Sequence, residues 1–481
     1  MRIAAISVAP IFPNYVIGGS QKILTDVTAG LKNLNHDVQI WCTGTSSHDG
    51  DFEVGGVPIH PDLQLRGSFP ATHQVSPVAL ARSAETLRNA AEWADRVYLH
   101  ADAVYLRHAL EGAEIVRSIH DYVYEEALLS TLSLGASATI VPSDYMKLVV
   151  ETTVAMTGRK SIEPVIVVPN GIEIPASIPE PRLPSDIAPR QSNDLVLLFP
   201  HRPEPTKGVK QAVLTAVEVQ HKLPDRNVRL LMPAYPVGSG LDDAAGTTDE
   251  ISDLVNDLDA SDIVELHGWL NPSDMSKYYA SGDVTLCIGS FVESFGLVPI
   301  ESVVNGTPAI CAKVGALRQF DGIDGILMVG YGDISAAAEA VLIASQDSVE
   351  IIESGRQQVA LKYSYSAMID SYEKLIIGSL NDGRLISNPS TNELTLAPWC
   401  DIQDGRIYDD YTAKYSQFDE LVNELVRGSN QIMVSKSETN EKLLEEIKSA
   451  KNLGILAPKF TFVSPVDHGL STNDRGLYDI R

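Results

Sequence analysis

The amino-acid sequence predicts an α/β protein with two doubly wound domains followed by a small α+β module. Short apolar runs, typical of strands buried on both faces of a parallel sheet, alternate with amphipathic helical stretches over roughly the first 380 residues. A polar, proline-rich stretch divides this alternation into two sets and is typical of an interdomain linker. Beyond residue 384 a new set of short elements begins. We therefore expect a first domain at 1–173, a linker at 174–194, a second domain at 195–362, a final helix at 363–380 and an accessory module at 385–481.

In the first domain, apolar runs and helical stretches follow one another as a doubly wound sheet requires. Helices are expected near 78–93 and 144–155, and an earlier one has an apolar face made of Ile23, Leu24, Val27, Leu31 and Leu34. The expected strands are Ile3–Ser7, Val38–Cys42, Val97–His100, Ile115–Ser118, Thr139–Val141 and Val165–Val168.

The second domain is organised around a strand, loop, helix and strand at residues 283–312. Val284–Ile288 is a largely apolar run, and the loop after it ends at Gly296. The next helix has Pro299 near its start and Gly306 just past its end. Open α/β sheets bind ligands at the carboxyl ends of their strands, where this loop lies. The other expected strands are Leu195–Phe199, Val228–Met232, Ile263–Leu266 and Pro308–Ala312.

Two glutamates flank the start of that helix. Glu293 lies in the loop and Glu301 in the helix, so both side chains can face one crevice. Between them, the amides of Gly296, Leu297 and Val298 begin the helix and form a natural seat for a phosphate. The pattern suits a ligand with hydroxyls at both ends and a diphosphate between them. Two solvated acids are the alternative that these residues by themselves leave open.

A basic loop, Pro200-His-Arg202-Pro-Glu-Pro-Thr-Lys207-Gly208, follows the first strand of the second domain. Its arginine offers a planar fork for phosphate oxygens, and its lysine offers a movable point charge. Because Arg202 and Lys207 face the same sheet edge as Glu293, they could neutralise a leaving diphosphate without a metal ion. Two exposed surface cations are the alternative.

The first domain contains two weaker candidates. Gly18-Gly19 follows the first strand and would let a phosphate approach the backbone at a helix start, although a plain turn is the alternative. His120 stands in Ser118-Ile-His120-Asp121, just after a strand end where functional side chains gather. A satisfied loop histidine is the alternative there.

The segment Glu293-Ser-Phe-Gly-Leu-Val-Pro-Ile-Glu301, followed by Asn-Gly-Thr-Pro, closely resembles the signature of retaining family 4 glycosyltransferases. The resemblance covers roughly residues 1–380. It implies the GT-B fold, in which two Rossmann-like domains face each other across a cleft and the closing helix at 364–377 crosses back onto the first domain. It also implies transfer of a sugar from a UDP- or GDP-type nucleotide diphosphate sugar to an acceptor hydroxyl, with retained anomeric configuration. We expect this transfer to need no metal ion, because Arg202 and Lys207 take the diphosphate role and no Asp-Xaa-Asp motif stands at a predicted strand end beside the donor motifs.

The resemblance assigns roles to the candidate residues. In the family, the glutamate that matches Glu293 holds hydroxyls of the donor sugar, and the one that matches Glu301 holds the nucleotide ribose. The cations that match Arg202 and Lys207 bind the diphosphate, and a histidine at the position of His120 lies near the sugar and phosphate. We therefore expect Glu293, His120, Arg202 and Lys207 to be the catalytic residues. No residue stands out as a nucleophile, so we expect same-face attack, with the leaving phosphate taking the acceptor's proton.

Further donor contacts are implied by weaker matches. Gly18-Gly19 matches the glycine loop of the family, which usually ends in an acid where this chain has Gln21. The family holds the nucleotide base with the backbone just before a helix cap, which here corresponds to Trp269 and Leu270 before Asn271.

The composition bears on partners and location. A net charge of −26 disfavours nucleic acid and an anionic membrane, so we expect a nucleotide-sugar donor and an acceptor that is soluble rather than a membrane lipid. No apolar run approaches the roughly 20 residues of a spanning helix, and the first residues resemble a strand rather than a signal peptide, which predicts a cytoplasmic protein. The cysteines and histidines show no metal-binding spacing, so no cofactor is expected.

The module at 385–481 carries no chemical motif. Its first strands, Leu394–Ile402 and Arg406–Tyr408, flank the hairpin signal Asp404-Gly405, and two amphipathic helices follow in an order that suggests a winged-helix-like arrangement. Docking of an acceptor or a partner is its expected role. For the whole chain, rival interpretations are a sugar-nucleotide epimerase or phosphorylase on the same architecture, and a degenerate glycosyltransferase that acts as a binding module.

Overall fold

The structure of the chain is a computed structural model. The residues that it describes are 1–13, 16, 18–44, 50–64, 75–101, 106–121, 125–234, 248–378, 383–387, 392–434 and 440–463. Parts of the expected accessory module, at 388–391, 435–439 and 464–481, lie outside them. The chain forms two bodies: the first comprises Met1–Pro13, Ser20–Val168 and Ile369–Arg481, and the second comprises Asn14–Gly19 and Pro169–Met368.

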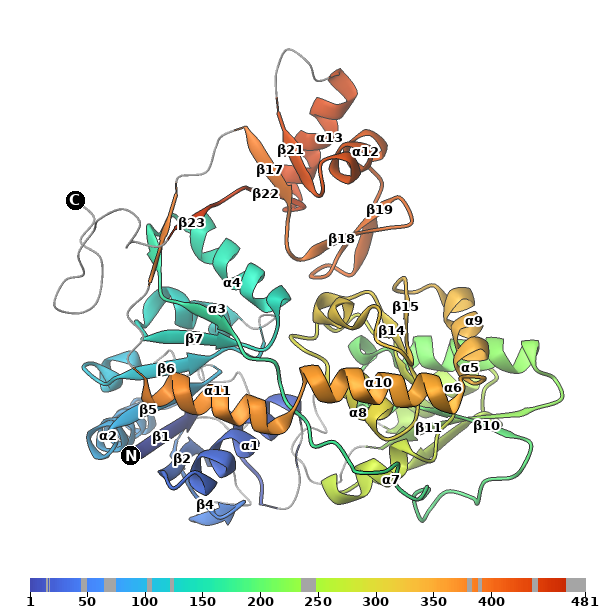
Figure 1. Cartoon of the computed structure of the whole chain (residues 1–481), viewed down its shortest axis with the longest axis horizontal. Helices are drawn as coiled ribbons and strands as arrows, with labels where there is room; N and C mark the ends of the chain where they lie inside the picture. The colour runs from blue at the N-terminus through green and yellow to red at the C-terminus, as the bar shows by residue number, and fades with distance from the viewer. Residues whose placement is uncertain are drawn as a thin grey trace. The chain divides into compact units, whose positions relative to one another are not determined.

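The first body contains a sheet whose strands are parallel except for one hairpin (Figure 1). The strand order is β3-β4-β2-β1-β5-β6-β7-β9, so the direction in which the chain adds strands reverses between β1 and β5. Such a reversal is the switch point beside which doubly wound sheets bind ligands. The strands are β1 (Arg2–Ser7), β2 (Asp37–Thr43), β3 (Phe52–Val54), β4 (Val57–Leu63), β5 (Arg96–His100), β6 (Ile115–Ser118), β7 (Ala138–Val141) and β9 (Val165–Val167).

The helices of the first Rossmann-like domain are α1 (Gly19–Asn33), α2 (Pro77–Trp93), α3 (Glu125–Ser133) and α4 (Asp144–Met156), with a short 3-10 helix, η2, at Arg107–Leu110. Of the residues predicted to form the buried face of α1, Leu34 does not belong: it follows the helix and is 38% exposed. The sequence interpretation also missed β4, because Pro58 and Pro61 argue against a strand, yet its residues alternate between buried and more exposed positions.

The second body contains a six-stranded parallel sheet with the order β12-β11-β10-β13-β14-β15. Its switch point therefore lies between β10 and β13. The strands are β10 (Asp194–Leu198), β11 (Asn227–Pro233), β12 (Val264–His267), β13 (Val284–Cys287), β14 (Ala309–Ala312) and β15 (Ile326–Val329). The helices are α5 (Val209–Lys222), α6 (Thr248–Asp257), α7 (Met275–Tyr279), α8 (Leu297–Val304), α9 (Ile334–Ala344) and α10 (Val349–Lys362), with 3-10 helices η3 (Pro205–Lys207), η4 (Pro272–Asp274) and η5 (Gly315–Phe320).

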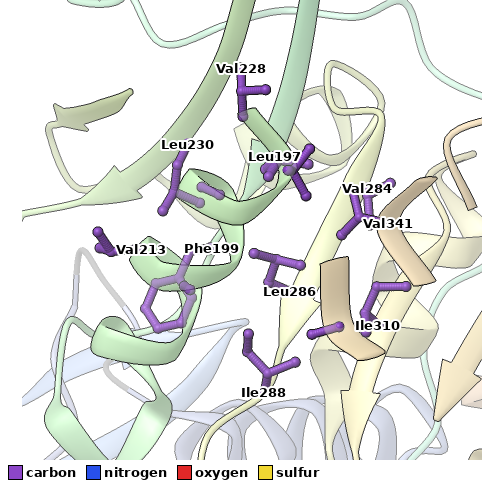
Figure 2. Close-up of a cluster of buried hydrophobic side chains, with 14 of the residues drawn as sticks. Leu197, Phe199, Val213, Val228, Leu230, Val284, Leu286, Ile288, Ile310 and Val341 are labelled. Carbon is purple, nitrogen blue, oxygen red and sulfur yellow. The ribbon is translucent and has the colours of Figure 1, made fainter. Parts of the chain in front are cut away.

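The strands expected for the two sheets are all observed, with ends that differ by at most one residue from those predicted. The reason is visible in the core of the second body, where apolar side chains of neighbouring strands pack against residues of helices α5 and α9 such as Val213 and Val341 (Figure 2). Burying each such Leu, Ile or Val stabilises the folded state by roughly 1.5–3 kcal/mol. A short apolar run in the sequence is therefore a good indicator of a buried strand. Fully buried members of this cluster include Leu197, Val213, Leu230, Leu286, Ile310 and Val341.

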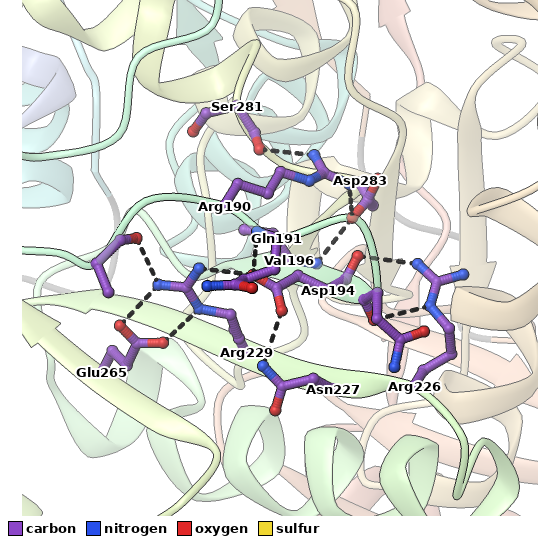
Figure 3. A network of polar contacts seen from close by, with 12 residues as sticks. Arg190, Gln191, Asp194, Val196, Arg226, Asn227, Arg229, Glu265, Ser281 and Asp283 are labelled. Atoms are coloured by element: carbon purple, nitrogen blue, oxygen red, sulfur yellow. Dashed lines mark hydrogen bonds and ion pairs between the residues drawn. The ribbon is translucent and has the colours of Figure 1, made fainter.

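The stretch predicted as a linker is attached to the second body. Near its end, the backbone carbonyl of Ala188 accepts a hydrogen bond from the Arg229 side chain, which also contacts Asp194 at 2.8 Å and Glu265 at 2.5 and 2.9 Å (Figure 3). Arg229 is only 4% exposed, so its two carboxylate partners compensate a charge that would be costly to bury alone. These contacts lie at the amino end of the second sheet, opposite the edge that carries the predicted site.

The helix α11 (Tyr365–Ile377) begins in the second body and ends in the first. From Ile369 onward it packs on the first domain: a Cβ on Gly30 of α1 would lie 2.6 Å from the Ile369 side chain. The ring of Tyr372 contacts that of Tyr98 in β5, with centroids 5.8 Å apart.

The C-terminal module also belongs to the first body. It has its own core and the elements β17 (Glu393–Leu396), β18 (Cys400–Gln403), β19 (Arg406–Asp409), β20 (Lys414–Ser416), α12 (Asp419–Arg427), β21 (Gln431–Met433), α13 (Glu441–Asn452) and β22 (Leu456–Pro458). The strands leading into and out of it, β16 (Arg384–Ile386) and β23 (Phe462–Val463), pair with each other, and β16 also pairs with β8 (Ser161–Ile162). The module is therefore held at both ends by one small sheet on the first domain.

One prediction for the module is wrong. Leu394–Ile402 is not a single strand, because Ala397-Pro398-Trp399 separates β17 from β18 and the two belong to different sheets. The predicted hairpin turn is confirmed: Asp404 and Gly405 have φ of 50° and 72°, the left-handed backbone that this pair favours, and they join β18 to β19. The winged-helix-like arrangement stays a prediction.

Candidate functional site

The loops that follow β10 and β13 meet at the switch point of the second sheet. Gly208, with φ of 94°, ends η3 where Gly289 of the other loop passes close by: a Cβ on Gly289 would lie 2.4 Å from the Lys207 carbonyl carbon. The backbone N–H of Phe291 donates to the carbonyl of Thr206 at 2.8 Å. Glycines at both positions therefore let the two backbones touch, which brings the basic loop and the Glu293 loop together.

Lys207 and Glu293 form an ion pair across these loops. Lysine Nζ lies 2.6 Å from Oε1 of the carboxylate, and the two side chains are 12% and 25% exposed. The ammonium also lies over the ring of Phe291, 3.5 Å from its centroid. Burial by itself would raise the pKa of Glu293, but Lys207, with smaller effects from His201 and Arg202, outweighs it and holds that pKa below its usual value. The carboxylate is therefore charged at neutral pH.

Arg202 and His201 lie at the start of the same basic loop. Arg202 is partly buried and pairs with Glu204 at 3.0 Å. The Nε2 atom of His201 lies 3.2 Å from the Leu286 carbonyl, which ties the loop to β13. Burial, followed by the nearby charge of Lys207, lowers the pKa of His201 to about 4, so its imidazole is neutral and the loop's positive charge comes from the arginine and the lysine.

The segment predicted to bind a phosphate lies at the start of α8, where the helix was expected to begin. Gly296 caps the helix with φ of 90°, and a Cβ there would lie 2.4 Å from the Leu317 side chain, so only glycine fits. Leu297 and Val298 are the first two helical residues. Their amides have no acceptor within the helix, since the first four N–H groups of any α-helix lack one. A small anion is stabilised at such a position by these donors and by the helix dipole.

Glu301 lies on the second turn of α8 and is held by a tyrosine that the sequence interpretation did not identify. The hydroxyl of Tyr279 donates to Oε2 of Glu301 at 3.2 Å, and Tyr279 is only 1% exposed. Burial, followed by the negative charge of Glu301, raises the pKa of Tyr279 well above its usual value, so the phenol remains a donor. Tyr279 closes α7, and no local pattern links that position to Glu301.

The segment expected to hold a base follows β12. Leu270 is partly buried against a cluster that includes Leu198 and Tyr278, and Trp269 is also partly buried. The backbone N–H of Gly268 donates to Asp186 at 2.7 Å, which anchors the segment. Asn271 precedes the 3-10 helix η4 as expected, but its side chain makes no capping hydrogen bond.

His120 lies in the first body, buried at 3% exposure just beyond β6. Its ring stacks on that of His100, with centroids 4.5 Å apart, and neither ring nitrogen has a hydrogen-bond partner among the described residues. Burial lowers the pKa of His120 to about 3, so the ring is neutral.

His100 was not predicted, although it ends β5 beside the switch point of the first sheet. Its Nδ1 lies 2.9 Å from the hydroxyl of Tyr98, and its Nε2 lies 2.9 Å from Oγ of Ser20. Ser20 follows the predicted Gly18-Gly19 pair, of which Gly18 precedes α1 and Gly19 opens it. The position of His100 at a strand end is the signal that could have identified it.

The structure thus brings together Arg202, Lys207, Glu293 and the start of α8 with Glu301 in one body, while His120 belongs to the other. Within the described residues, one cluster of metal-ligating type was found: Asp51, His60 and Asp62, whose ligand atoms lie within 4.8 Å of one another. It contains none of the predicted site residues. None of the helices in the described part of the chain is long and apolar enough to cross a membrane.

Comparison with known proteins identifies proteins that are similar in sequence to this chain. Residues 185–358 match the family model described as glycosyl transferases group 1. The D-inositol 3-phosphate glycosyltransferase of Corynebacterium kroppenstedtii is 32% identical over 158 residues, which are 32% of this chain and 34% of that protein. The D-inositol 3-phosphate glycosyltransferase 2 of Catenulispora acidiphila is 29% identical over 197 residues, which are 40% of this chain and 45% of that protein. The chain therefore matches about a third to under half of the length of these relatives.

Solved structures show the fold over a longer span. Sucrose-phosphate synthase from Thermosynechococcus elongatus aligns with a TM-score of 0.63 at 18% identity and covers 78% of this chain and 98% of its own. The Anabaena protein HepE, crystallised with UDP and glucose, aligns with a TM-score of 0.57 at 18% identity over 78% of this chain and 98% of its own. Residues 185–358 therefore resemble group 1 glycosyl transferases, and the chain is built on the GT-B fold.

Proposed function

We propose that the protein transfers a sugar from a nucleotide diphosphate sugar to an acceptor hydroxyl, with retained anomeric configuration and without a metal ion. The observation that carries the proposal is the group at the second switch point: two cations on one loop, the start of α8, and a glutamate on each side of that start. The cations and the helix start suit the donor's diphosphate, and the two glutamates suit its sugar and its ribose.

The donor's diphosphate would bind to Arg202, Lys207 and the first amides of α8. Negative charge grows on this group as the bond to the sugar breaks, and donors already in place stabilise it without reorganisation. Arginine and lysine supply two positive charges at the site, which is the charge that a divalent metal would otherwise bring. Metal independence follows from this as an expectation.

Glu293 would orient the sugar, and Glu301 would bind the ribose. The charged state of Glu293 suits acceptance of hydrogen bonds from sugar hydroxyls. It is also held by Lys207, so we assign it an orienting role and not that of a nucleophile. Attack of the acceptor from the face that the diphosphate leaves, with the leaving phosphate accepting the acceptor's proton, then accounts for retention.

The donor's base is proposed to be uracil or guanine, held by the backbone at Trp269 and Leu270. HepE was crystallised with UDP and with UDP-glucose, which supports a UDP-type donor as the first to test. The net charge of −26 favours an acceptor in solution over one in an anionic membrane.

The test is to incubate the protein with a panel of UDP- and GDP-sugars, with and without a small-molecule extract, and to follow products by mass spectrometry. We expect one donor to release nucleoside diphosphate only when acceptor is present, with a new glycoside whose anomeric configuration matches that of the donor. The same rate in EDTA supports metal independence, whereas loss of activity that manganese restores contradicts it. Epimerised donor, or turnover that needs inorganic phosphate, would instead identify an epimerase or a phosphorylase.

A further inference from the structure

Lys207 and Glu293 are bonded to each other, although the proposed function gives them different ligands. The lysine is assigned to the diphosphate and the glutamate to the sugar, yet their Nζ and Oε1 atoms lie 2.6 Å apart. At 12% and 25% exposure the pair is partly shielded from solvent, so its attraction is stronger than that of a surface pair. A ligand must therefore compete with this bond.

Phe291 gives the lysine a second anchor that does not depend on the glutamate. Its ring centroid lies 3.5 Å from Nζ. The backbone of Phe291 donates to Thr206, the residue before Lys207, so the ring is attached to the lysine's own loop. The ammonium can therefore stay over the ring while its anionic partner changes.

Glu293 is charged near pH 7, because nearby positive charge holds its pKa below the usual value. The groups whose charges act on it are Lys207, His201 and Arg202, of which the histidine is neutral near pH 7 because its pKa is about 4. Since Arg202 is paired with Glu204, Lys207 is the cation most directly held by the Glu293 carboxylate. Competition between this carboxylate and a phosphate for the ammonium follows from the geometry.

We propose that Lys207 exchanges partners during the reaction cycle. When a sugar occupies the site, its hydroxyls engage Glu293 and leave the ammonium to the diphosphate. When the sugar has been transferred, Glu293 takes Lys207 back and weakens the hold on the nucleoside diphosphate product. This inference rests on the proposed function and adds to it that Glu293 discriminates donor from product and promotes product release.

The experiment measures the Kd of UDP and of GDP, without sugar, by calorimetry for the wild-type chain and for Glu293→Gln. Glutamine keeps the shape of the side chain and removes its charge. We expect the variant to bind the free nucleoside diphosphate about tenfold more tightly, which corresponds to about 1.4 kcal/mol. A substitution that only damages the site would weaken binding.

Two controls separate partner exchange from a general effect of charge. Glu293→Gln in a Lys207→Met background should change the Kd less than about twofold, because interacting residues show their coupling as non-additivity. Glu339→Gln removes the same charge from another lysine pair of 2.6 Å, at the far end of α5 from Lys207, and should leave the Kd unchanged. Circular dichroism of each variant confirms folding, and Glu293→Ala serves as a second variant.

The outcomes are distinguishable. Tighter binding in Glu293→Gln that disappears without Lys207 supports partner exchange. An unchanged or weaker affinity in both Glu293 variants overturns the inference alone, as does a gain that persists in the Lys207→Met background. If neither UDP nor GDP binds to the wild-type chain or to the variants, the proposed function and the inference both fail.

Discussion

Replacing Glu301 by glutamine should weaken donor binding much more than it slows turnover. The carboxylate lies on the second turn of α8, beyond the helix start that would bind the diphosphate, so it would face the ribose and not the reacting sugar. A hydrogen bond to a charged group contributes roughly 1.5–3 kcal/mol. Glutamine replaces it with a neutral hydrogen bond of about 0.5–1.5 kcal/mol, and the difference of about 1–1.5 kcal/mol corresponds to roughly a 5- to 13-fold rise in KM. We expect kcat to change by less than about threefold, since a contact equally strong in ground state and transition state does not alter it.

Tyr279 makes the choice of substitution important. Alanine at position 301 would leave the buried Tyr279 hydroxyl without this acceptor, which costs about 1–3 kcal/mol of stability in addition to the ribose contact. Glutamine keeps an oxygen that can accept the hydrogen bond. Glu301→Ala should therefore lower Tm, whereas Glu301→Gln should retain most of the stability and report the ribose contact by itself.

The assay is initial-rate kinetics with the donor varied at saturating acceptor, with thermal unfolding of each variant alongside. Glu339→Gln, which removes a surface carboxylate of the same body, is the matched control and should behave as wild type. A fall in kcat with unchanged KM for Glu301→Gln would refute the argument. If Glu301→Gln lowered only kcat and Glu293→Gln raised only KM, the donor would lie in the opposite direction along the site.

The remaining predictions concern the reacting sugar, pH and the module. Glu293→Gln should lower kcat by about 100-fold or more, because hydrogen bonds to sugar hydroxyls strengthen in the transition state and supply several kcal/mol; unchanged kcat in rapid kinetics would contradict this. Stability should fall as pH is lowered from 6.5 to 4, since unfolded histidines bind protons that buried His120 and His201, with pKa values of about 3 and 4, do not. For each histidine the free energy of unfolding should change by about 1.4 kcal/mol per pH unit. The substitution His120→Asn should reduce this slope, as measured by denaturant titrations at several pH values. Replacing 388–460 by Asn-Gly, which joins the paired strands β16 and β23 in a two-residue turn, should leave a folded protein that binds nucleotide but loses transfer to its natural acceptor; unchanged transfer would exclude a role for the module in acceptor recognition.

Much of this protein could be predicted from local sequence. Most strands of the two sheets could be predicted because each is a short run of apolar residues. Such a run must be buried, so the sequence of the run is enough to indicate the strand. The positions of the candidate site residues in the second body could be predicted because strand, loop and helix start are consecutive in the chain, as at Glu293, Gly296 and Glu301. That the loop of Arg202 and Lys207 lies beside them could be predicted because a parallel sheet places its strand-end loops at one edge.

The sequence by itself therefore determined the fold class, the two sheets and the residues that gather at the second switch point. Only the tertiary structure decided how these residues are paired. Lys207 and Glu293 are 86 positions apart, Tyr279 reaches Glu301 from another helix, and His100 stacks on His120 from a neighbouring strand. Strand β16, which leads into the C-terminal module, pairs with β8, more than 200 positions earlier. The physical reason is that burial and helix periodicity are properties of a segment, whereas ion pairs, hydrogen bonds and ring contacts depend on distances that exist only once segments remote in the chain have packed together.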